Sequence, residues 1–140
     1  MAIIKLQYEP IDTDFYYQQL KDPHYGGIVS FAGTVREWTD DIQTRSIEYT
    51  AYEVMAIKEL EKLAVVIEQQ GAKVVIVHRL GKLALMDEAV FVGVATPHRK
   101  EAFAGCIYIM DQLKKTVPIW KKENDSDSVR WGGIEDGKKD

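Results

Sequence analysis

The segment Thr96-Pro97-His98-Arg99 could bind an anion. Threonine is a common helix N-cap and proline favours the first helical position, so we expect a helix to begin here. Unpaired backbone N–H groups and the positive end of the helix dipole attract anions, and the planar arginine side chain suits phosphate. The alternative is that His98 and Arg99 only hydrate the helix start. Because acids are the usual residues of a first helical turn, two cationic residues there favour a ligand.

A group of lysines forms a second candidate site. Within nine residues that contain no acid, the chain has four of them: Lys114, Lys115, Lys121 and Lys122. Lysines near a helix C-terminus are commonly dipole partners on a wet surface, which is the alternative interpretation. Pro118 and Trp120 would instead hold Lys121 on a rigid, partly apolar corner. A lysine that loses hydration in this way becomes a usable acid or base.

Three other residues have chemistry-bearing side chains. Arg36 ends the strand that contains Phe31, where side chains leave a sheet and can face a cleft; the alternative is an ordinary surface arginine. His78 lies within a strand pattern and is expected to be structural. Cys106 falls on the apolar side of a helix, so we expect a core residue and not a nucleophile. The chain has no zinc-type spacing, P-loop, GxGxxG or GxSxG motif.

The composition limits the classes of function. With 140 residues and one cysteine, the chain is expected to fold as one domain, residues 1–140, without a disulfide framework or a cysteine-rich metal site. A net charge of −4 argues against nucleic-acid and membrane-surface binding, since both use broad positive fields. No apolar run reaches the roughly 18 residues that span a bilayer, and no signal-peptide pattern is present, so we expect a cytoplasmic protein.

Apolar periodicity and turn residues predict the elements that position these residues. We expect β-strands at about 3–8, 27–35, 45–52, 73–81 and 88–97, and helices at about 13–21, 53–70 and 98–115. A polar loop at 38–43 and an irregular C-terminal tail complete the expected chain. Hairpin-like neighbours mixed with crossover helices predict an α+β fold, a mostly antiparallel sheet with helices packed on one face.

The helix predicted at 98–115 has an apolar side with three- and four-residue spacing. Its members are Phe103, Cys106, Ile107, Met110 and Leu113.

Three segments resemble the large, catalytic subunits of molybdopterin synthase, the MoaE family. They are FAGTVRE (31–37), HRLGKLALMDEAVFVGVATPHRKEAF (78–103) and MDQLKKTVPIWKKE (110–123). The resemblance extends from about Gly26 to Trp131 and implies an α/β-hammerhead-like arrangement. The tail departs from the family, since Gly132-Gly133-Ile134-Glu135 stands where members often have a further basic residue.

The resemblance also implies a set of site residues. Two lysines would be catalytic, Lys114 and Lys121. The substrate would be bound by Thr34, Val35, Arg36, His98, Arg99, Lys122 and Glu123. The pocket walls would be Phe31 and Met110, and neither a metal nor a cofactor is implied.

The implied reaction converts cyclic pyranopterin monophosphate to molybdopterin. The cationic residues would hold the substrate phosphate, and a ubiquitin-like small subunit would insert its C-terminal Gly-Gly thiocarboxylate. Two deliveries would supply the dithiolene sulfurs, so this sulfurtransferase would need no sulfur of its own. The family assembly is a homodimer within a heterotetramer.

Helix length suggests a shared site. Arg99 and Lys114 are fifteen residues apart on one predicted helix, which is about 22 Å at roughly 1.5 Å per residue. One small pterin cannot contact both, so we expect His98 and Arg99 of one copy to meet a set of residues of the other: Arg36, Lys114 and Lys121. Two alternatives remain: a non-catalytic dimeric module that binds a phosphorylated metabolite, and an RNA-binding domain that uses residues 114–122.

Overall fold

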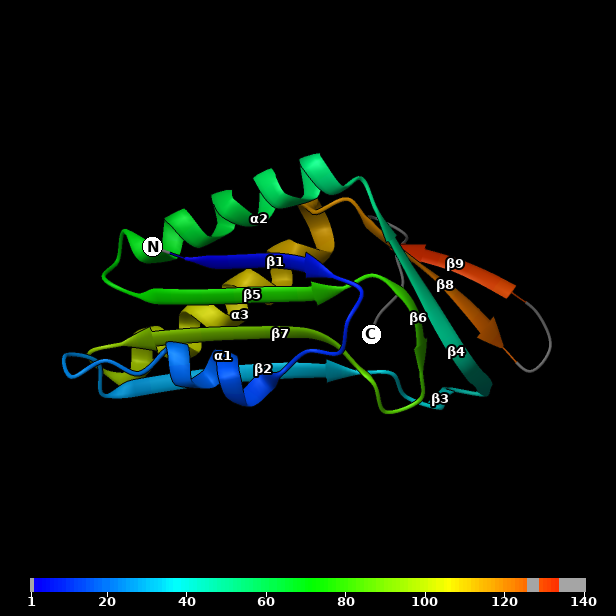
Figure 1. Ribbon diagram of the computed structural model, residues 1–140, viewed down its shortest axis with the longest axis horizontal. Helices are drawn as coiled ribbons and strands as arrows, with labels where there is room; N and C mark the ends of the chain where they lie inside the picture. The colour runs from blue at the N-terminus through cyan, green and yellow to red at the C-terminus, as the bar shows by residue number, and fades with distance from the viewer. Residues whose placement is uncertain (1, 126–128, 134–140) are drawn as a thin grey trace.

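The computed structural model describes residues 2–125 and 129–133 and has an α+β fold, as the sequence predicts (Figure 1). Among the described residues, no helix is long and apolar enough to cross a membrane. The elements in chain order are β1 (Ile3–Gln7), α1 (Thr13–Gln19), β2 (Gly27–Thr34), β3 (Trp38–Thr39), β4 (Ile42–Ala51), α2 (Glu53–Glu68), β5 (Lys73–Arg79), β6 (Gly81–Ala84), β7 (Glu88–Thr96), α3 (Arg99–Thr116), β8 (Ile119–Asp125) and β9 (Val129–Gly133).

The first of two sheets has four strands in the order β1-β5-β7-β2. β1 and β5 are parallel, while β5–β7 and β7–β2 are antiparallel. The central strands are nearly continuous apolar runs with almost every side chain buried. This pattern is typical of strands that are covered on both faces.

The helices do cover both faces of this sheet, which corrects the expectation that all of them pack on one face. α2 and α3 pack against Val74, Ile76 and Val92, whereas α1 packs on the opposite side against Val75 and Val77. In Figure 1, α1 lies in front of the sheet and α3 behind it. The physical reason is the continuous apolar run of β5. Without α1, the apolar side chains on that face of the sheet would be exposed to water.

A second sheet contains β3, β4, β8 and β9 in that order, and β6 also pairs with β4. The expected loop at 38–43 is a hairpin that turns at Asp40, which has a positive φ of 53°. The predicted strand at 73–81 ends at Arg79, and β6 begins at Gly81, whose φ of 91° favours glycine.

The predicted irregular tail is wrong for the residues that the structure describes, because they form β8 and β9. The inward positions of β8 include Lys121 and Glu123, so the strand lacks the apolar alternation that signals a β-strand. The C-terminal part of the tail, 134–140, lies outside the described residues.

The inner side of α3 approaches the sheet closely at Gly105. A Cβ atom at this glycine would lie 3.1 Å from Ile67 Cγ2 and 3.2 Å from Val94 Cγ1. Both neighbours are buried core residues, so the packing there has no room for a branched side chain.

Replacing Gly105 with Val should therefore lower the free energy of unfolding by about 1–3 kcal/mol, because the added methyl groups overpack the contact between α3 and β7. Urea denaturation measures this change. Ala104→Val is the matched control, since Ala104 is exposed on the same helix and its substitution should change stability by less than about 1 kcal/mol. Equal effects of the two substitutions would contradict the packing argument.

Candidate active site

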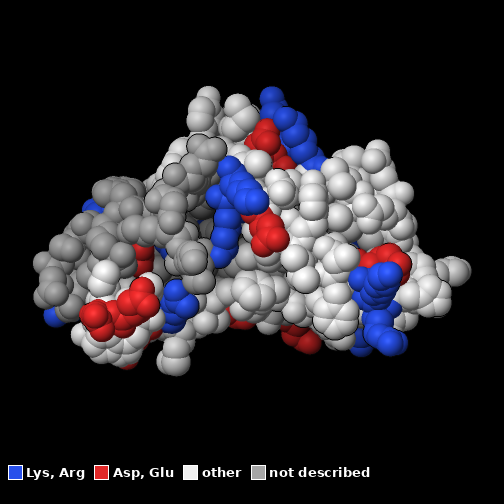
Figure 2. Space-filling view, turned by 180° about the vertical axis from the view of Figure 1, so that it is seen from behind, with Lys and Arg blue, Asp and Glu red and all other residues white. Residues whose placement is uncertain are grey.

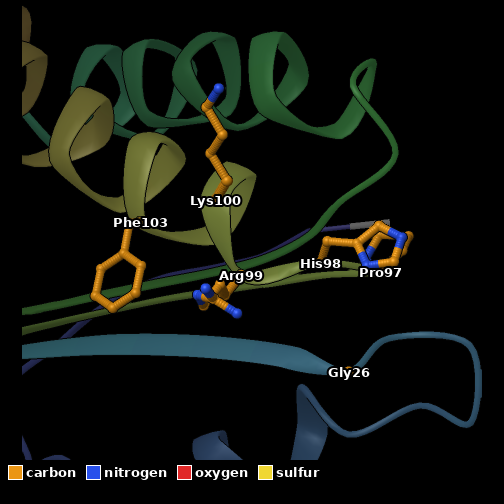
Figure 3. A pocket seen from close by; sticks show the side chains of 6 residues that line it. All are labelled: Gly26, Pro97, His98, Arg99, Lys100 and Phe103. Carbon is orange, nitrogen blue, oxygen red and sulfur yellow. The ribbon is translucent and has the colours of Figure 1, made fainter.

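A hollow of about 750 Å³ lies at the N-terminus of α3 (Figure 3). It is lined by Gly26, Pro97, His98, Arg99, Lys100 and Phe103. In Figure 3 the side chains of Arg99 and Phe103 lie on the side of the helix that faces β2, whereas Lys100 points away. The first hollow thus combines a guanidinium group and an aromatic ring at the positive end of a helix dipole.

The N-cap of α3 lies two residues after the predicted cap. His98, in an extended conformation, is the N-cap and makes no side-chain capping bond. Thr96, predicted as the cap, instead donates its hydroxyl hydrogen bond to the backbone oxygen of His98. No side chain caps the start of α3. Its first backbone N–H groups can therefore donate hydrogen bonds to an anion.

Two glycines let β2 pass directly beside this helix start. Gly26 N–H donates to the backbone oxygen of Pro97 at 3.2 Å. A Cβ atom at Gly27 would lie only 2.9 Å from Arg99 Cα, and this atom belongs to the backbone, which cannot move aside cheaply. The glycine pair therefore fixes the position of Arg99 relative to the sheet.

A second hollow, of about 290 Å³, lies further along the same helix. It is lined by Phe31, Cys106, Ile107, Met110, Asp111 and Lys114. The structure thus brings the two predicted pocket walls, Phe31 and Met110, together with the predicted catalytic Lys114. Arg99 lines the first hollow and Lys114 the second, and α3 is one continuous helix between them. The separation of about 22 Å expected from the helix rise therefore holds within one chain.

The residues at the end of β2 fall into two groups. Thr34 and Arg36 are exposed. Val35, between them, is only 3 % exposed and belongs to a small core cluster with Ile47. Its backbone N–H and C=O are bonded to Asp87 and Met86, respectively. The side chain of Val35 therefore anchors Arg36 and does not reach the surface.

β8 carries the remaining predicted site residues. Lys121 and Glu123 alternate with Lys122, so the first two share one face of the strand and Lys122 lies on the other. Glu123 is 5 % exposed, whereas both lysines are partly buried. An anionic, buried side chain is better suited to interact with neighbouring cations than with a phosphate.

The sequence prediction missed an exposed apolar stripe on α3. Phe103 and Ile107, which were expected on the apolar side together with Cys106, are 55 % and 61 % exposed. The side of α3 that packs on the sheet consists of its buried residues: Ala102, Gly105, Cys106, Ile109 and Leu113. Figure 2 shows an extensive uncharged area on this face between groups of Lys and Arg side chains.

Two candidate residues are structural, as predicted. Cys106 is buried, and burial raises the pKa of its thiol, which disfavours the nucleophilic thiolate. His78 is also buried, and its Nδ1 lies 2.7 Å from the backbone oxygen of Arg79. Among residues 2–125 and 129–133, no group of three or more His, Cys, Asp or Glu could hold a metal ion.

Comparison with known proteins identifies the family. The model of the family described as MoaE protein matches residues 6–116. The chain belongs to the MoaE family. A relative from Staphylococcus carnosus, named molybdopterin synthase catalytic subunit, is 45 % identical over 131 residues, which are 92 % of this chain and 87 % of the relative.

Other members of the MoaE family agree with this assignment. The protein of the same name from Staphylococcus aureus strain Mu50 is 39 % identical over 139 residues, or 98 % of this chain and 94 % of the relative. The X-ray crystal structure of molybdopterin synthase from Staphylococcus aureus superposes with a TM-score of 0.86 at 40 % identity, covering 91 % of this chain and 95 % of that one.

The buried His78 predicts a pH dependence of stability. Burial lowers its pKa from 6.5 to about 4, although the hydrogen bond to Arg79 opposes the shift. Between these two values the unfolded chain binds a proton that the folded chain does not, so stability falls as the pH drops. Between pH 7 and pH 5 the protein should lose about 2 kcal/mol more stability than a His78→Gln variant. The free energy of unfolding of each protein is measured by urea denaturation at several pH values. Equal changes with pH in the wild type and the His78→Gln variant would contradict this assignment.

Proposed function

We propose that this chain is the catalytic subunit of a molybdopterin synthase. It converts cyclic pyranopterin monophosphate to molybdopterin with sulfur from the C-terminal thiocarboxylate of a ubiquitin-like small subunit. The observation that carries the proposal is the second hollow, where Lys114 stands beside the apolar walls Phe31 and Met110. The names and identities of the MoaE relatives support the same activity.

The first hollow is suited to hold the substrate phosphate. His98 and Arg99 contribute cationic or donor side chains, and the helix start contributes backbone N–H groups. An arginine can bind phosphate through two parallel hydrogen bonds, which fixes orientation as well as affinity. Phe103 closes one side of the hollow with an apolar ring that a flat pterin can contact.

Lys114 and Lys121 supply the acid–base and electrostatic chemistry. When the acyl carbon of the thiocarboxylate becomes tetrahedral, negative charge develops on its oxygen. An ammonium group placed there stabilises that charge, and a neutral amine can accept a proton. Cys106 lines the second hollow but is buried, and burial raises the pKa of its thiol, which fits a reaction in which the partner's acyl group brings the sulfur.

A homodimer completes the site. In the described chain β2 is an edge strand that pairs only with β7, and its sequence GIVSFAGT has neither charge nor proline to block pairing. The exposed Phe103 and Ile107 lie on α3, which packs beside β2. A second copy that covers this surface with its α3 antiparallel would bring Arg99 of one copy to Lys114 of the other.

Replacing Lys114 with Ala should lower product formation by at least about tenfold to a hundredfold, while the cyclic pterin still binds, because the phosphate-binding residues remain. The rate is measured with thiocarboxylated small subunit and cyclic pterin, and substrate binding by calorimetry. A non-catalytic module that binds a phosphorylated metabolite would not lose function with Lys114.

Lys115→Ala is the matched control. Lys115 is exposed and adjacent on α3 but does not line the second hollow, so its removal should leave the rate within about twofold. Equal losses for both substitutions would mean that general surface charge, and not Lys114, supports the reaction.

Co-expression of the Arg99→Ala and Lys114→Ala variants tests the shared site. Half of the dimers formed are mixed, and each mixed dimer has one intact site if the two residues act across the interface. Activity should therefore recover to about a quarter of the wild-type value, well above the activity of either variant alone. Activity no higher than that of the separate variants would place both residues in the same copy's site.

A further inference from the structure

Tyr49 lies where the two sheets meet, directly opposite Lys121. The register of the second sheet pairs Tyr49 on β4 with Lys121 on β8 and, across the other edge, with Gly81 on β6. Residues directly opposite one another in an antiparallel pair point to the same face, with Cβ atoms roughly 5 Å apart. The ring of Tyr49 therefore lies beside the stem of the proposed catalytic lysine.

The ring is turned towards the interior. Tyr49 packs against two core clusters, one that contains Leu113 and Ile119 and one that contains Ile47. The first cluster includes the last turns of α3, and Lys114 follows Leu113 directly in the chain. Tyr49 thus packs against both clusters from β4, the strand that pairs with β8.

His78 packs against the ring of Tyr49. The rings of Tyr49 and His78 contact each other edge to face, with centroids 4.9 Å apart and planes at 74°. His78 itself is fixed by burial and by its bond to the backbone oxygen of Arg79. In Figure 1, β5, which ends one residue after His78, runs towards β6 and β4. The orientation of Tyr49 is therefore set by two rigid strands.

We propose that Tyr49, oriented by His78, is a positioning residue for Lys121. A lysine side chain has four rotatable bonds and about 2 kcal/mol of rotamer entropy. A rigid wall along its stem therefore lowers the entropy lost when its ammonium group is held in place for catalysis. The ring restricts the directions that the Lys121 side chain can adopt on its face of β8. The proposal rests on the proposed function, in which Lys121 takes part in sulfur transfer.

The aromatic ring, and not the hydroxyl group, does the positioning in this scheme. Replacing Tyr49 with Leu should reduce kcat by about tenfold with KM for the cyclic pterin within about twofold, because the phosphate-binding residues are untouched. Tyr49→Phe keeps the ring and should restore kcat to within about twofold of the wild type. If Tyr49→Leu does not fold, Tyr49→Met, which keeps more side-chain length, takes its place.

Tyr16→Leu is the control for general loss of packing. Tyr16 is a buried aromatic residue on the opposite face of the first sheet, where it contacts Phe91. It should lower the melting temperature without lowering kcat at a temperature where the variant is folded. A normal kcat for Tyr49→Leu, a Phe variant as slow as the Leu variant, or equal losses for Tyr16→Leu would each overturn the proposal.

Lys121→Ala separates this inference from the proposed function. In the Lys121→Ala background, Tyr49→Leu should cause no further loss of kcat, since it acts through the lysine. A further tenfold loss in the double variant would overturn the positioning role. Full activity of Lys121→Ala would instead remove Lys121 from the proposed mechanism, and the positioning role with it.

Discussion

The packing of α3 on the four-stranded sheet is the constraint on which the rest of the structure depends. Gly105 allows the middle of the helix to approach β7, and Gly27 allows its start to pass beside β2. Since α3 is held along its whole length, its two ends cannot move towards one another. The helix therefore fixes a hollow that contains Arg99 at one end and a hollow that contains Lys114 at the other.

This arrangement explains why the exposed side of α3 is apolar. A soluble protein rarely leaves large side chains such as Phe103 and Ile107 in water next to an unprotected edge strand. The uncharged area of Figure 2 fits an interface that joins two hollows from different copies. In this account the same surface that stabilises the dimer also assembles the site.

The sequence was most informative where one physical pattern dominated. The apolar runs of β5 and β7 and the helix that ends near Pro118 could be predicted because burial alone determines them. β8 could not, because the charged Lys121 and Glu123 occupy inward positions and interrupt the apolar alternation of a strand. The exposure of Phe103 and Ile107 could not be predicted, because an exposed apolar residue and a core residue have the same apolar signature in a sequence.

The candidate site was predictable by residue type and not by arrangement. Phe31, Met110 and Lys114 do line one hollow, but periodicity could not show that Val35 is buried between Thr34 and Arg36. Nor could it show Tyr49 beside Lys121, since that contact depends on the register of strands far apart in the chain.

In the proposed reaction this chain supplies the site and the partner supplies the sulfur. Reconstitution with a small subunit that carries isotopically labelled sulfur in its thiocarboxylate tests it most directly, with a Cys106→Ala variant assayed beside the wild type. Both dithiolene sulfurs should carry the label, and the Cys106→Ala variant should form product at the wild-type rate. Unlabelled sulfur in the product, or product formation that depends on Cys106, would contradict it.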